Sequence, residues 1–380
     1  MFQYWGRRGA VQQLTLEVAR AALAEPEIAT TISVSRQSEL FGAFTEFGSS
    51  LVAVDTFSSN LGALSSSWRI PIVRRRLYDE LAARRIEAVI DLMPHVWSPF
   101  VTAVIRGAGA LYVPIVHDAI AHPGDRTGWA NWLIGRSTAG ADLVITLSEA
   151  VAQELLSSGR VEEPKLRTLF HPDLSYVPAH PGRGLERGLP KRLLFLGRLM
   201  KYKGLSLLLD ALEILRNENV SVTLGVFGEG NIDDELPRLH LFGAEVVNRW
   251  LASEEIAGVL GRFDAVVLPY LEASQSGVAA AAFGAGLPVV VTPVGGLIEQ
   301  VTDGHNGVVA RSCKAADLAH AIRRLLLDGA FYAKLCSNIN ADREERSMRR
   351  FVRACAEIVS TAQEHGVGLK GLNHQLKRNQ

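Results

Sequence analysis

The 380-residue sequence has few cysteines and no long apolar run. Cys313, Cys336 and Cys355 are widely spaced, so they give neither an even disulfide set nor the spacing of metal ligands. We therefore expect reduced thiols in a cytoplasmic protein. No apolar run reaches the roughly 18 residues of a transmembrane helix, and the first residues lack the apolar segment of a secretory signal.

An excess of charge of one sign is also missing. The 40 Lys and Arg residues balance 40 Asp and Glu residues, so the formal net charge is zero. Nucleic-acid-binding proteins usually carry a basic excess. Nucleic acid is therefore not an expected partner.

The apolar residues, 48% of the chain, occur mostly in short runs that alternate with helix-period segments. This alternation predicts an α/β protein with parallel sheets, and the length favours two domains. In the first half, strands are expected at residues 2–5, 31–35, 51–56, 88–92, 111–116 and 143–147. In the second half, they are expected at residues 193–196, 222–227, 245–247, 265–268 and 288–291.

We predict two Rossmann-like, doubly wound domains. The N-terminal domain is expected at residues 1–175, a linker rich in Pro and Gly at 176–190, and the C-terminal domain at 191–345. A helix at 346–366 is expected to pack back toward the N-terminal domain, and 367–380 form a polar tail. Parallel sheets bind ligands at the carboxyl ends of their strands, so two facing sheets predict a site in an interdomain cleft.

The segment GRLMKYKG, residues 197–204, follows one predicted strand and precedes a helix. Arg198 and Lys203 fall on the turn at the carboxyl end of that strand, where two cations can neutralise a diphosphate leaving group. A solvated basic loop is the alternative. The GxxxxGK[ST] pattern of P-loop nucleotidases is absent here.

A second glycine turn, FGEGNID, spans residues 227–233. Gly228 and Gly230 suit a tight turn beside a nucleotide. The third glycine of the dinucleotide fingerprint is replaced by Asp233, which argues against a nicotinamide oxidoreductase.

The loop QSGV, residues 275–278, lies between an apolar strand and a helix of mostly small residues. Backbone N–H groups at the first positions of a helix have no partner within the helix and can bind phosphate. Ser276, Gly277 and Val278 are therefore candidate phosphate-binding residues.

These three motifs, followed by LPVVVTPVGGLIEQVTDGHNGVVA, occur in the order and spacing typical of one family. They resemble the donor-binding domain of retaining GT-B glycosyltransferases, and in particular the bacterial family four, the glycosyl transferases of group 1. The resemblance is strong over residues 193–328 and looser over 1–160. It implies a GT-B fold, transfer of a sugar from a nucleotide-sugar donor with retention at the anomeric carbon, and no metal or other cofactor.

The resemblance also implies roles for residues of the C-terminal half. Arg198 and Lys203 would hold the donor diphosphate and stabilise the charge of the leaving group. The backbone at 276–278 would take the distal phosphate. The nucleobase would lie beside Asn248, Arg249 and Trp250, although Trp250 is equally suited to the core.

In the N-terminal half, the resemblance implies that His117 reaches toward the transferred sugar and helps to stabilise the transition state. Its place at a strand end and its near-neutral titration suit this role, and a capped turn is the alternative. Asp118 is expected to cap the turn, and His122 to line the same opening. Gly9 is expected to open the first helix and to approach donor phosphate or acceptor.

The sequence departs from the family at two glutamates. Members usually have two glutamates across this loop and helix, one for the transferred sugar and one for the ribose. Counted back from Pro288, the expected positions hold Ala273 and Ala281. The ribose contact is therefore expected to be lost, and Glu272 is the candidate for the sugar contact.

A basic segment at residues 68–85 places Arg69, Arg74, Arg75 and Arg76 among apolar residues. A helix of this kind can lie on an anionic membrane, where similar enzymes meet lipid-linked acceptors. An ordinary solvated helix is the alternative. We expect a cytoplasmic protein with possible contact to the inner face of the membrane.

The leading hypothesis is thus a hexosyltransferase-type enzyme with a glycan or lipid-linked acceptor, in the synthesis of cell-surface polysaccharide or glycolipid. The alternative is a non-catalytic subunit of the same fold that binds a sugar nucleotide or a partner protein and has lost the glutamate pair. The presence of Arg198, Lys203 and His117 favours the hypothesis of an enzyme over that of a binding subunit.

Overall fold

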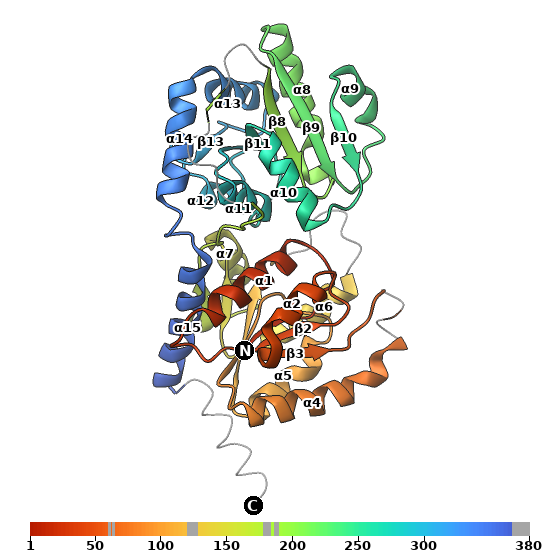
Figure 1. Cartoon of the computed structure of the whole chain (residues 1–380), viewed down its shortest axis with the longest axis vertical. Helices are drawn as coiled ribbons and strands as arrows, with labels where there is room; N and C mark the ends of the chain where they lie inside the picture. Colours follow the sequence, from red (N-terminus) through yellow and green to blue (C-terminus); the bar gives the residue numbers. More distant parts are fainter. Residues whose placement is uncertain (60–61, 63–64, 120–127, 178–183, 186–189, 367–380) are drawn as a thin grey trace, which may run out of the picture. The chain divides into compact units, whose positions relative to one another are not determined.

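The computed structural model describes residues 1–59, 62, 65–119, 128–177, 184–185 and 190–366 (Figure 1). The described residues divide into two compact units. Unit 1 holds those up to Phe170 and those from Met348 onward, and unit 2 holds His171 to Ser347. Most of the predicted linker and the whole polar tail lie outside the described residues.

The described part of unit 1 forms a seven-stranded parallel sheet in the order β3-β2-β1-β4-β5-β6-β7. Its strands are β1 Phe2–Tyr4, β2 Ile32–Ser35, β3 Leu51–Val54, β4 Ala88–Asp91, β5 Leu111–Val116, β6 Val144–Thr146 and β7 Leu166–Thr168. Its helices are α1 Ala10–Leu23, α2 Phe41–Phe44, α4 Ile70–Ala83, α5 Ser98–Gly107, α6 Gly128–Ala139, α7 Glu149–Ser157 and α15 Met348–Glu364, with short 3₁₀ turns at Thr45–Ser50, Ser67–Arg69 and Glu163–Lys165.

The described part of unit 2 forms a six-stranded parallel sheet in the order β10-β9-β8-β11-β12-β13. Its strands are β8 Lys191–Leu196, β9 Val222–Gly228, β10 Glu245–Asn248, β11 Ala265–Leu268, β12 Val289–Val291 and β13 Gly307–Val309. Its helices are α8 Leu205–Asn217, α9 Leu236–Leu241, α10 Ser253–Arg262, α11 Gly277–Gly284, α12 Leu297–Gln300, α13 Ala315–Leu327 and α14 Gly329–Ala341, with a 3₁₀ turn at Lys201–Lys203.

Both sheets confirm the predicted doubly wound topology. In each unit the strand order reverses beside the first strand, between β1 and β4 in unit 1 and between β8 and β11 in unit 2. Open parallel sheets bind ligands at such switch points, beyond the carboxyl ends of the strands. The loops that follow these four strands are therefore the candidate ligand-binding positions.

Every predicted strand is present, within two residues at each end. Among the described residues, the prediction missed β7 and β13, which are three-residue strands at the sheet edges. The sequence of β7, LRT, is mostly exposed, and β13 contains a glycine. An edge strand this short has too few apolar residues to show a pattern.

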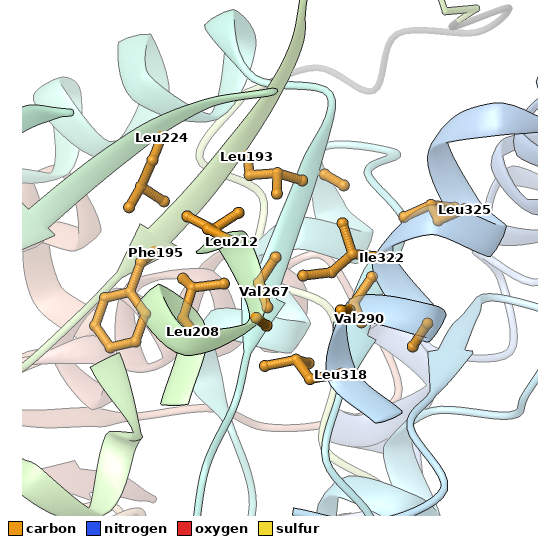
Figure 2. Packing of buried hydrophobic residues seen from close by; sticks show 14 of the residues in the cluster. Leu193, Phe195, Leu208, Leu212, Leu224, Val267, Val290, Leu318, Ile322 and Leu325 are labelled. Carbon is orange, nitrogen blue, oxygen red and sulfur yellow. The ribbon is translucent and has the colours of Figure 1, made fainter. Parts of the chain in front are cut away.

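Burial in unit 2 follows the alternation of side chains along its strands. Leu193 and Phe195 of β8 and Val267 of β11 pack with leucines of α8 and with α13 on one face of the sheet (Figure 2). Leu194 of β8 is also fully buried but lies outside this cluster, as expected for a residue facing the other side. Because both faces are covered, the strands are nearly continuous apolar runs.

Unit 1 ends five residues earlier than predicted, at Phe170. The following residues are bound to unit 2: the Leu174 N–H donates to the Ala280 carbonyl of α11 at 3.1 Å. Asp173 is buried, and its carboxylate accepts from Arg346 Nε at 3.0 Å. These contacts fix the segment to α11 and to the chain between α14 and α15, connections between distant residues that the sequence does not display.

The last helix, α15, belongs to unit 1 and lies against α1 (Figure 1). The buried carboxylate of Glu25 accepts from Arg349 Nε at 2.5 Å and from Arg353 Nε at 2.7 Å. The two arginines are one helical turn apart, so both reach the same carboxylate.

A pair of Gly→Ala variants tests the close packing at the carboxyl edge of the unit 2 sheet. A Cβ atom on Gly230 would lie 2.1 Å from the Leu199 carbonyl oxygen, so we expect Gly230→Ala to lower the free energy of unfolding by about 1–3 kcal/mol. Gly258, in the exposed interior of α10, has nothing near its added Cβ, so Gly258→Ala should stabilise by up to about 1 kcal/mol. Urea unfolding measures the free energy of unfolding of both variants. Equal changes in the two variants would contradict the close packing at Gly230.

Candidate active site

Arg198 follows β8 directly at the switch point of unit 2. The preceding residue, Gly197, has φ +113°, and a Cβ there would lie 3.3 Å from Val278 Cγ2. The end of β8 therefore packs against the first turn of α11. Arg198 is exposed, and its Nη2 donates to the Tyr202 hydroxyl at 3.2 Å.

Lys203 ends the 3₁₀ turn that follows Arg198. This turn closes at Gly204, where φ is +74° and a Cβ would lie 1.9 Å from the Pro269 carbonyl oxygen, so only glycine fits. The Leu271 N–H donates to the Tyr202 carbonyl at 2.7 Å. The turn is thus fixed to the chain after β11, and Lys203 Nζ lies 3.7 Å from the centroid of the Tyr270 ring.

The N-terminus of α11 completes this cluster. Ser276 is the N-cap, with its Oγ accepting from the Ala279 N–H at 3.3 Å. Its own N–H donates to Gln300 Oε1 at 2.7 Å, and Gln300 Nε2 donates to the Ser276 carbonyl at 3.3 Å.

The prediction that the Ser276 N–H takes a phosphate therefore needs correction, because a side-chain amide already occupies it. The N–H groups of Gly277 and Val278 are the first two of the helix and precede any acceptor within it. Arg198, Lys203 and this helix start thus lie in one cluster, linked through Gly197 and Tyr270. No motif in the sequence indicated Gln300, which lies 24 residues from Ser276.

Gly228 and Gly230 join the loops after β8 and β9. A Cβ on Gly228 would lie 1.8 Å from the Gly197 carbonyl oxygen, and one on Gly230 would lie 2.1 Å from that of Leu199. The Leu199 N–H donates to the Glu229 carbonyl at 2.9 Å. The tight turn is as predicted, and in the described contacts both glycines serve backbone packing.

The residues predicted to flank a nucleobase lie at the end of β10 and directly after it, and they contact neighbouring segments. The Asn248 side chain accepts from the Gly230 N–H at 3.1 Å and donates to the Gly230 carbonyl at 2.9 Å. Arg249 makes a bidentate pair with Glu255, at 3.0 and 2.6 Å, and this hydrogen bonding lowers the pKa of Glu255 to about 2. Trp250 is partly exposed.

The positions of the missing glutamates lie on either side of this helix start. Glu272 is exposed on the turn after β11. The carbonyl of Ala273 accepts from the Gly296 N–H at 3.1 Å, so its backbone is fixed. Ala281 is buried within α11.

In unit 1, Gly9 is the N-cap of α1, as predicted, with φ +114° and no atom within 4 Å of an added Cβ. His117 follows β5, and its Nε2 lies 2.7 Å from the Leu92 carbonyl oxygen. Since a carbonyl only accepts, Nε2 carries the hydrogen. Burial lowers the pKa of His117, which favours the neutral imidazole. His122 lies outside the described residues.

The loop that holds His117 is anchored by Asp91, which the sequence prediction missed. Asp91 ends β4, is fully buried, and accepts from Ser98 Oγ at 2.7 Å and from the Tyr112 hydroxyl at 2.9 Å. Its Oδ1 and both polar atoms of the Gln3 side chain, on the adjacent strand, are buried, and no hydrogen bond of good geometry reaches them from the described residues. Burial raises the pKa of Asp91 to about 6. A carboxylate ending an apolar strand was the available signal.

Two further features concern metals and membranes. Within the described ranges, no group of three or more His, Cys, Asp or Glu side chains is placed to hold a metal ion. None of the helices that the structure describes is both long and apolar enough to cross a membrane.

Comparison with known sequences matches unit 2 most clearly. Residues 190–328 fit the family described as glycosyl transferases group 1. The glycogen synthase of Mycobacterium tuberculosis (strain CDC 1551 / Oshkosh) is 34% identical over 208 residues, which are 53% of this chain and 48% of that protein. The D-inositol 3-phosphate glycosyltransferase of Streptomyces bingchenggensis is 29% identical over 284 residues, 66% of this chain and 62% of that protein. The chain thus spans between 48% and 62% of the length of these curated relatives.

Solved structures resemble the whole chain. Anabaena HepE, solved in complex with UDP, has a TM-score of 0.70 at 17% identity, covering 95% of this chain and 98% of HepE. The lipopolysaccharide outer core galactosyltransferase WaaB has a TM-score of 0.65 at 16% identity, covering 94% of this chain and 98% of WaaB. These likenesses, with the two doubly wound sheets, show that the chain has the predicted GT-B fold.

The buried Asp91 predicts a pH dependence of stability. Its pKa rises from 3.8 in the unfolded chain to about 6 in the fold, so the native state disfavours ionisation. Wild type should lose stability, relative to Asp91→Asn, as the pH rises from about 4 to about 6. A shift of this size corresponds to about 3 kcal/mol.

Urea unfolding of Asp91→Asn and wild type between pH 4 and 7.5 measures this difference. The exposed Asp79 of α4 provides the control variant, Asp79→Asn. We expect the free energy of unfolding of Asp91→Asn minus that of wild type to increase with pH. A value that stays constant across the range, or that decreases with rising pH, would contradict the prediction.

Proposed function

We propose that the protein is a retaining glycosyltransferase that moves a sugar from a nucleotide-sugar donor to a glycan or lipid-linked acceptor. The observation that carries this proposal is the meeting of Arg198, Lys203 and the start of α11 at the switch point of unit 2. All three lie within the residues that match the group 1 glycosyl transferases. A structural neighbour bound to UDP supports a nucleotide-sugar donor.

The proposed chemistry needs positive charge where the donor breaks. When the bond between sugar and diphosphate opens, negative charge develops on the leaving oxygen. Arg198 and Lys203 supply two cations beside it, and the Gly277 and Val278 N–H groups add the positive end of the α11 dipole. These residues supply this charge without a metal ion in the proposed reaction.

At the sugar end, the proposal assigns Glu272 and His117. Glu272 is exposed at the loop after β11 and would contact the transferred sugar in place of the missing glutamate. His117, neutral and oriented by the Leu92 carbonyl, would act as a hydrogen-bonding group from unit 1. Retention at the anomeric carbon and a role in cell-surface polysaccharide or glycolipid synthesis are parts of the same proposal.

Substitution of the cations separates the enzyme from a non-catalytic binding subunit. We expect Lys203→Ala and Arg198→Ala each to lower sugar transfer by about 10²–10³-fold, because each removes a charge that stabilises the leaving group. Lys201→Ala, in the same turn and more exposed than Lys203, is the control and should keep activity within about threefold.

Transfer and donor hydrolysis are measured with UDP-, GDP-, ADP- and CDP-sugars. Full activity of Lys203→Ala would refute the assigned role of the cation. If wild type binds a nucleotide-sugar but neither transfers nor hydrolyses it, the result would instead favour the non-catalytic binding subunit.

The acceptor proposal includes contact with an anionic membrane through α4. Val73, Leu77 and Leu81 form the buried face of this helix. Apolar Ile72 of α4 and Trp68 of the preceding 3₁₀ turn are 45% and 64% exposed, and Arg74, Arg75 and Arg76 of α4 are also exposed. Apolar side chains next to arginines suit the boundary between lipid headgroups and acyl chains. Arg69 is less available, because it donates to the Thr56 carbonyl at 3.3 Å.

Vesicle flotation tests this contact. We expect wild type to float with vesicles rich in phosphatidylserine. Salt at about 0.5 M should release it, because screening of the arginine charges lowers the affinity for the vesicles by about an order of magnitude. Substitution of Arg74, Arg75 and Arg76 by Ala should abolish flotation. The control variant replaces three arginines of unit 2 by Ala, namely Arg216, Arg238 and Arg262, and so removes the same amount of charge. If both triple variants float equally, α4 is not the contact.

A further inference from the structure

We infer that Tyr270 is a positioning residue for Lys203: its ring is the surface that holds the lysine ammonium at the candidate diphosphate site. The consequence for ligand binding rests on the proposed function, whereas the contact itself is a feature of unit 2.

The geometry places the ammonium over an aromatic face. Lys203 Nζ lies 3.7 Å from the centroid of the Tyr270 ring and 5.0 Å from that of Tyr202. Attraction between a cation and a ring acts within about 6 Å, so both rings contribute and Tyr270 contributes more. A lysine side chain has four flexible carbons, and this contact limits where its charge can lie.

Tyr270 is itself firmly held. The residue is 1% exposed, its carbonyl accepts from Thr292 Oγ1 at 2.5 Å, and its hydroxyl lies 3.4 Å from Ser276 Oγ. One side chain therefore links Lys203 to the N-cap of α11. Burial raises the pKa of Tyr270 to about 12, so the ring is uncharged near neutral pH.

A neutral ring suits this task better than a carboxylate. A carboxylate would hold the ammonium strongly but would repel the incoming diphosphate. The face of an aromatic ring attracts the cation without adding a negative charge. Arg198 follows the same principle, since it donates to the uncharged hydroxyl of Tyr202 at 3.2 Å.

Substitutions at Tyr270 and Lys203 test the coupling by calorimetric titration with UDP, GDP, ADP, CDP, inorganic pyrophosphate and uridine. We expect Tyr270→Leu to weaken binding of the preferred nucleoside diphosphate by about 5–30-fold, as for loss of one cation–π contact. Tyr270→Phe, which keeps the ring, should stay within about threefold of wild type. Uridine, which has no phosphate, should respond to neither variant.

A double variant shows whether the two residues act together. Tyr270→Leu combined with Lys203→Met should bind no more weakly than Lys203→Met alone, because the lysine is then absent. Additive losses, or wild-type affinity in Tyr270→Leu, would overturn the inference.

A spectroscopic measurement without ligand separates this inference from the proposed function. Protons above an aromatic face are shielded, so in ¹³C-lysine-labelled protein the ε-methylene signal of Lys203 should lie upfield, assigned by its loss in Lys203→Met. It should keep this shift in Tyr270→Phe and move to the ordinary position in Tyr270→Leu. Absence of the upfield shift in wild type overturns the inference even where Tyr270→Leu does not fold. A wild type that shows the shift but binds none of the phosphates overturns the proposed function instead.

Discussion

Direct contact between backbones shapes the carboxyl edge of the unit 2 sheet. Gly204, Gly228 and Gly230 each lie so close to a carbonyl of a neighbouring loop that a Cβ would fall within about 2 Å of its oxygen. This approach lets the loops after β8, β9 and β11 pack as one layer. Without it, neither the turn that carries Lys203 nor the chain that leads into α11 would hold its place.

On this base, uncharged groups position the charges. Lys203 lies over the Tyr270 ring, and Arg198 donates to the Tyr202 hydroxyl. Gln300 fixes Ser276 by two hydrogen bonds from its neutral amide. None of these contacts adds negative charge to the site. The arrangement is suited to a ligand that brings its own, such as a diphosphate.

Unit 1 uses buried polar contacts at the equivalent edge of its sheet. Asp91 accepts from two hydroxyls, one of them on Ser98, and so fixes both ends of the loop whose Leu92 carbonyl orients His117. This device is sensitive to pH, because a buried carboxylate without a cation partner in the described contacts is costly to ionise.

The sequence by itself determined the doubly wound fold, the strand positions and the three motifs at strand ends. Apolar runs of one strand length and the local requirements of turns are recorded directly in the residues. Tertiary structure alone decided that Gln300 occupies the Ser276 N–H, that Asn248 binds Gly230 and that Tyr270 lies under Lys203. Two of these contacts join residues 67 and 24 positions apart, and all three depend on which loops a strand order brings together. The periodicity of each helix or strand can be read from the sequence, but the contacts of a side chain depend on tertiary packing.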